Sequence, residues 1–158
     1  MDIQAFYALF AATCFTLVGL WWTVVKSRPD WIANDGTRNL AGGVYLSFLI
    51  PGLMGLFAQV GGQGAVIWRT TFLIAGGLGI YFTTRLIVKT RQSGTPGPFR
   101  RNRWIVIVLY SLVILIALLP GLALYFGLLP LQLEAMVLVL LILIAHGLTW
   151  EFMTEPQA

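Results

Sequence analysis

The chain has 158 residues, of which 58% are hydrophobic and only 10% charged. A typical soluble domain carries about 25% charged residues, so this composition excludes a soluble enzyme and a disordered chain. With a mean hydropathy of +0.85, we expect an all-α polytopic membrane protein. Residues 1–158 would then form a single transmembrane domain with no soluble domain.

Five apolar runs are long enough to cross the hydrocarbon core of a bilayer, which takes about 20 residues of helix. They cover residues 5–25, 40–60, 65–88, 104–126 and 131–150. The runs are continuous, without the alternation of a transmembrane β-barrel, and a helix satisfies its own backbone hydrogen bonds in lipid. Pro51 and Pro120 lie inside the second and fourth runs, where a proline removes one helix hydrogen bond. The sequence therefore predicts a bundle of five transmembrane helices with kinks at these two prolines.

The distribution of basic residues predicts the orientation of the bundle. Nine of the ten lie in or beside the two segments that follow the first and third runs: Lys26, Arg28, Arg38, Arg85, Lys89, Arg91, Arg100, Arg101 and Arg103. The connections on the opposite side, residues 61–64 and 127–130, contain none. Because cytoplasmic loops are enriched in Lys and Arg, we expect a multi-pass protein of the plasma (inner) membrane. Its N-terminus would lie outside and its C-terminus in the cytoplasm.

Small residues recur at helical spacing on the first two runs, as they do where transmembrane helices pack closely. They define a predicted helix-packing seam, which comprises Ala8, Ala12, Thr16, Gly19, Gly43, Ser47 and Gly55. The seam has two interpretations. It can pack helices of this bundle against one another, or it can contact another chain in an oligomer.

Two charged residues fall inside the predicted spans, where a charge is costly and often functional. Arg69 and Glu134 each lie four residues into a run, at matching depth below the outer end. They are candidates for an intramembrane ion pair, and the alternative is that each side chain reaches separately toward the headgroups. His146 is the only histidine. It is either a proton-linked group or a polar packing residue.

The sequence lacks the motifs of several classes of enzymes and cofactor-binding proteins. It contains no HExxH helix, no GxSxG turn, no CxxC pair and no phosphate-binding loop. A single histidine cannot provide the two axial ligands of a bis-histidine haem. We therefore expect no catalytic residues, no metal site and no cofactor.

Two functional hypotheses remain. The first is a non-catalytic integral membrane protein, namely a subunit, assembly or scaffold component of a membrane complex. The alternative is a homo-oligomeric channel or small-solute transporter. The expected partners are the lipid bilayer and other membrane subunits or further copies of this chain, but no nucleic acid, because the net charge of +4 arises from residues that flank the spans.

Overall fold

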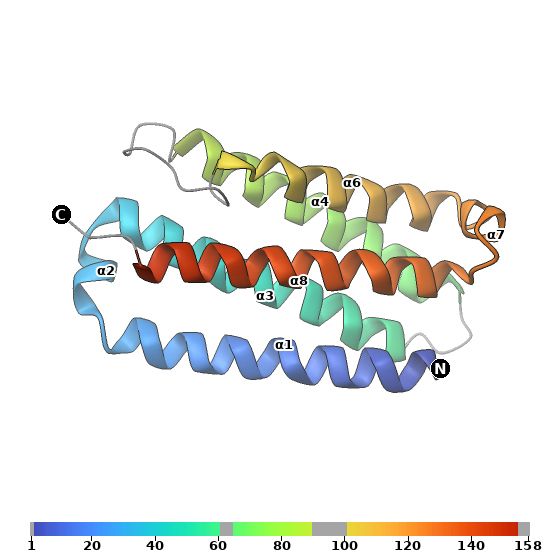
Figure 1. Cartoon of the computed structure of the whole chain (residues 1–158), viewed down its shortest axis with the longest axis horizontal. Coiled ribbons are helices and arrows are strands. Elements are labelled where there is room, and N and C mark those ends of the chain that lie inside the picture. The colour runs from blue at the N-terminus through green and yellow to red at the C-terminus, as the bar shows by residue number, and fades with distance from the viewer. Residues whose placement is uncertain (1, 61–64, 90–100, 155–158) are drawn as a thin grey trace.

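The computed structural model describes residues 2–60, 65–89 and 101–154 (Figure 1). The regular elements in these ranges are α-helices, which confirms the predicted all-α class. They are α1 (Ile3–Lys26), α2 (Pro29–Ala33), α3 (Asp35–Val60), α4 (Ala65–Lys89), α6 (Trp104–Leu118), α7 (Leu122–Tyr125) and α8 (Pro130–Thr154).

Four of these helices, α1, α3, α4 and α8, are long and apolar enough to cross a membrane. Their bounds agree closely with four of the predicted spans, because long apolar runs have few alternatives to a helix in lipid. Helix α1 begins where the Asp2 side chain accepts a hydrogen bond of 2.9 Å from the Gln4 N–H. It ends three residues before Pro29, which begins α2.

The helix expected over residues 104–126 ends earlier in the structure, at Leu118. Helix α6 has 15 residues, which is about 22 Å at 1.5 Å per residue and is shorter than the other candidate spans. Leu119 leaves the helical conformation with φ −120° and ψ 68°, as is expected of a residue that precedes proline. Pro120 therefore ends the helix instead of kinking it, and the one-turn helix α7 follows. Pro51 behaves differently, since α3 continues through it; the bend expected there stays a prediction.

Helix α3 is central in the bundle and contacts α1, α4 and α8, while α6 packs against α4 and α8. In Figure 1 the long helices run side by side along the molecule, with α2 near one end and α7 at the other. The end that carries α2 also holds the described basic residues that lie at helix ends: Lys26, Arg28, Arg38, Arg85, Lys89, Arg101 and Arg103. We call it the basic end; Arg91 and Arg100 lie outside the described residues.

The centre of the bundle is closed by large side chains. Tyr7, Met54, Phe72, Ile116 and Leu138 are almost fully buried and come from five different helices. The outer surface is also apolar, with side chains such as Leu9, Val66 and Leu143 more than half exposed. This distribution is typical of a bundle whose surroundings are lipid.

Candidate functional site

The α3 members of the predicted packing seam lie against neighbouring helices. A Cβ placed on Gly55 would lie 3.1 Å from Phe10 Cδ1 on α1, and one on Gly43 would lie 2.6 Å from Leu86 Cδ2 on α4. The Ser47 side chain is half-buried, and its hydroxyl donates to the Val44 carbonyl at 2.7 Å. The two glycines thus lie against other helices of the same bundle, whereas Ser47 lines a cavity between α3, α4 and α6.

The α1 members of the seam face the other way. Ala8, Ala12, Thr16 and Gly19 are all exposed, and a Cβ on Gly19 would meet no atom within 4 Å. The opposite face of α1 supplies the residues that pack into the bundle, among them Tyr7, Phe10, Ala11, Cys14 and Val18. We call Ala8, Ala12, Thr16 and Gly19 the α1 outer face.

The α1 outer face has little polarity despite its threonine. The Thr16 hydroxyl donates to the Ala12 carbonyl one turn earlier, at 2.8 Å. The hydroxyl therefore needs no water or lipid headgroup as its partner, and the face presents a shallow strip of small groups that a second helix can approach closely.

Arg69 is bound to the end of a neighbouring helix. Its Nε donates to the Ala117 carbonyl at 2.7 Å, and its Nη2 donates to the Leu118 carbonyl at 3.2 Å. Both acceptors belong to the last turn of α6, whose carbonyls have no partner within the helix. The cation also lies at the negative end of the helix dipole. The structure thus gives Arg69 a definite role as a side-chain cap of α6.

Glu134 is fully buried, with 0% of its surface exposed. Neither of its carboxylate oxygens has a hydrogen-bond partner in the described part of the chain. The structure therefore does not join Arg69 and Glu134 in the ion pair that their matching depth suggested. The depth along a helix follows from residue counting, whereas the direction of each side chain depends on packing, and Arg69 points to α6.

His146 lies on the exposed side of α8 toward the basic end. Its Nδ1 donates to the Ile142 carbonyl at 2.8 Å, and its ring meets the Phe48 ring edge-on, with centroids 5.4 Å apart. Both contacts are those expected of a polar packing residue. In the described ranges no group of three or more His, Cys, Asp or Glu side chains is placed to hold a metal ion.

A cavity at the basic end was missed by sequence reasoning. It has a volume of about 290 Å³ and lies between α3, α4 and α6, with Arg38, Arg85 and Lys89 among its lining residues. In the sequence, the basic residues indicated only the orientation of the bundle. The available signal was the four-residue spacing of Arg85 and Lys89, which puts both on one face of a helix.

No family model matches this chain, and comparisons with curated proteins and with solved structures find no match either. The four long apolar helices and the lipid-compatible surface identify the chain as an all-helical, multi-pass membrane protein.

Proposed function

We propose that this chain is a non-catalytic component of a membrane complex, a subunit or an assembly or scaffold factor. It contacts a transmembrane helix of another chain through the α1 outer face. In this proposal α6 and α7 together form the fifth membrane span of a single transmembrane domain. The basic end lies in the cytoplasm and the N-terminus outside, in the plasma membrane.

The observation that carries the proposal is the exposure of the α1 outer face. Transmembrane helices associate where small residues let their backbones approach closely. On α3, Gly43 and Gly55 lie against other helices of the bundle, whereas on α1 the row of small residues has no partner in the described part of the chain. The exposed side of α8, by contrast, carries larger groups, among them Met136, Val139, Leu140 and Leu143.

The closed centre of the bundle favours this proposal over a channel formed by one chain. Beyond the inner end of the cavity, which Ile50 and Gly79 line, buried side chains such as Met54, Phe72 and Leu138 lie between the helices. A conducting path would therefore need several copies of the chain around a shared axis. That arrangement is the homo-oligomeric alternative, and it too would use an exposed helix face.

Photo-crosslinking in native membranes distinguishes these cases. A photoreactive amino acid replaces Ala12 at the middle of the α1 outer face, and the matched control replaces Leu143, which is 63% exposed near the middle of α8. We expect the Ala12 probe to form a defined adduct with a different protein. We expect the Leu143 probe to react with lipid.

Mass spectrometry of the adducts decides the outcome. An adduct between Ala12 and a second copy of this chain would overturn the proposal in favour of a homo-oligomer. Lipid adducts alone at Ala12, or the same protein adducts at both positions, would show that the α1 outer face is ordinary lipid-facing surface.

A further inference from the structure

The cavity at the basic end is an elongated space that runs along α3 and α4 and is backed by α6. On α3 its lining extends from Arg38 to Ile50, and on α4 from Lys89 to Gly79. At 1.5 Å per residue these stretches correspond to roughly 15–18 Å of helix. The cavity therefore reaches from the end of the bundle well into its apolar part.

The outer part of the cavity is positively charged. Arg38, Arg85 and Lys89 line it, and no acidic residue of the described chain does. Asn39, Ser47 and Thr83 add polar groups to the lining. An anion placed in this partly open space would meet Arg85, Lys89 and several hydrogen-bonding groups, together with Arg38, whose guanidinium also pairs with Asp35. Such a cluster of basic and hydrogen-bonding groups recognises phosphate.

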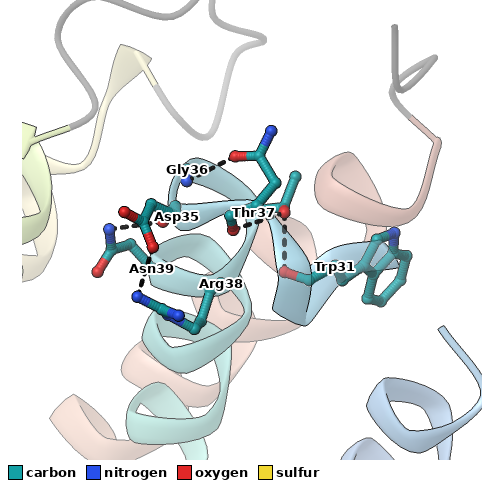
Figure 2. Close-up of polar contacts among 7 residues, drawn as sticks. Trp31, Asp35, Gly36, Thr37, Arg38 and Asn39 are labelled. Carbon is teal, nitrogen blue, oxygen red and sulfur yellow. Dashed lines mark hydrogen bonds and ion pairs between the residues drawn. The ribbon is translucent and has the colours of Figure 1, made fainter. Parts of the chain in front are cut away.

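The junction between α2 and α3 holds Arg38 and Asn39 in place (Figure 2). The Asn34 side chain accepts a hydrogen bond of 2.8 Å from the Gly36 N–H and so caps the start of α3. Asn39 Nδ2 donates to the Asp35 carbonyl at 2.6 Å, and Arg38 forms an ion pair with the Asp35 carboxylate. Side chains of this first turn thus hold its backbone, and the backbone positions of Arg38 and Asn39, which line the cavity, are well defined.

The inner part of the cavity is apolar. Leu46, Ile50, Phe82, Val106 and Tyr110 form its walls. Gly42 lines the same space, and a Cβ at that position would meet no atom within 4 Å. A free anion would use only the charged part, whereas a molecule with an anionic head and a hydrocarbon chain would match both parts.

We propose that this cavity binds an anionic phospholipid, with the phosphate of its head group among Arg38, Arg85 and Lys89. The first part of one acyl chain lies along the apolar walls. The volume of about 290 Å³ fits a head group and the start of a chain, because whole ligands of drug size take roughly 300–1,000 Å³. Such a lipid would be a specific, retained component of the protein.

Lipid binding to the purified full-length chain in a neutral detergent tests this proposal. The probes are dioleoyl phosphatidylglycerol, dioleoyl phosphatidylcholine and inorganic phosphate, with bound lipid counted by native mass spectrometry. We expect phosphatidylglycerol to bind at least tenfold more tightly than phosphatidylcholine. We expect inorganic phosphate at millimolar concentration to leave its binding nearly unchanged.

Charge variants test the head-group contacts. A basic residue near an anionic lipid surface contributes about 1 kcal/mol, which corresponds to about fivefold in affinity. Arg85→Gln and Lys89→Gln should therefore each weaken phosphatidylglycerol binding by about fivefold. Lys26→Gln is the matched control, since Lys26 lies at the basic end but does not line the cavity.

A filling variant tests the cavity without changing charge. Gly42→Leu should abolish tight binding while the melting temperature is kept, because open space surrounds the new side chain. Gly77→Leu is its control, since Gly77 is exposed on α4, has the same open surroundings and does not line the cavity.

Equal affinity for the two lipids would overturn the proposal, as would equal losses in Lys26→Gln and Arg85→Gln. Unchanged binding in Gly42→Leu would also overturn it, because the lipid would then lie elsewhere. Full competition by inorganic phosphate would reassign the cavity to a free anion.

Discussion

Arg69 is a charged residue within the candidate span α4, and its side chain binds backbone carbonyls of α6 instead of the expected carboxylate. Its guanidinium binds two carbonyls of α6 that Pro120 leaves without helical donors. Sequence reasoning identified the residue because a charge in a span is costly. It could not identify the partner, since the free carbonyls exist only because α6 ends at Leu118.

The structure predicts that Arg69 and Glu134 contribute independently to stability. Arg69→Met should lower the free energy of unfolding by about 1–3 kcal/mol, because it removes charge-assisted hydrogen bonds from the end of α6. Glu134→Gln alters a buried group that has no described hydrogen-bond partner. In a double-mutant cycle measured by unfolding in detergent, the two effects should add to within about 0.5 kcal/mol.

The cycle also tests the alternative of a direct ion pair. A paired buried charge loses its partner in each single variant, so the double variant would recover part of the loss. A recovery of more than about 1 kcal/mol would show that the two side chains interact.

At the scale of the helices, the contact between α1 and α3 depends on α3 glycines. A Cβ on Gly52 would lie 2.8 Å from Cys14 Cβ, and that atom is attached directly to the α1 backbone. Relief of the clash would require the two helices to move apart. The close approach of α1 and α3 therefore depends on the absence of a side chain at Gly52.

We expect Gly52→Val to destabilise the protein by about 1–3 kcal/mol, the usual cost of forcing extra volume into a packed interface. Gly19→Val on α1 is the control, because its surroundings are open. Thermal unfolding monitored by circular dichroism in one detergent compares the two. Equal melting temperatures would contradict the packing of α1 on α3.

The sequence predicted the existence of the long helices well and the end of the fourth run poorly. Leu-rich segments on both sides of Pro120 give the same hydropathy whether the helix bends or stops. Only the conformation of Leu119 and the turn that follows distinguish the two outcomes.

The seam shows a similar limit, since small residues mark close packing but lipid and protein are equally apolar neighbours for Ala12 and Gly19.

At the scale of the whole molecule, the described basic residues other than Arg69 belong to helix ends that lie together at one end of the bundle (Figure 1). The opposite end carries Arg69, whose side chain is directed to α6. Because cytoplasmic segments are enriched in Lys and Arg, this asymmetry predicts that the basic end faces the cytoplasm. The cavity proposed to hold a phospholipid would then open toward the cytoplasmic leaflet, where anionic lipids gather.

Cysteine labelling in intact cells measures this orientation. Ala33→Cys places a thiol at the basic end, and Tyr125→Cys places one at the opposite end, where the native side chain is 88% exposed. We expect a membrane-impermeant maleimide to label Tyr125→Cys and to label Ala33→Cys only after lysis. The wild-type chain is the control because Cys14 is buried, and the reverse labelling pattern would contradict the orientation.

The mass of the native assembly tests the proposed role in a membrane complex most directly. A chain of 17.5 kDa solubilised in mild detergent should migrate as part of a larger assembly that contains other proteins. Gly19→Leu should release it as a monomer, whereas Gly77→Leu, an equally open glycine on α4, should leave the assembly intact. A wild-type monomer, or an unchanged assembly in Gly19→Leu, would contradict the role of the α1 outer face.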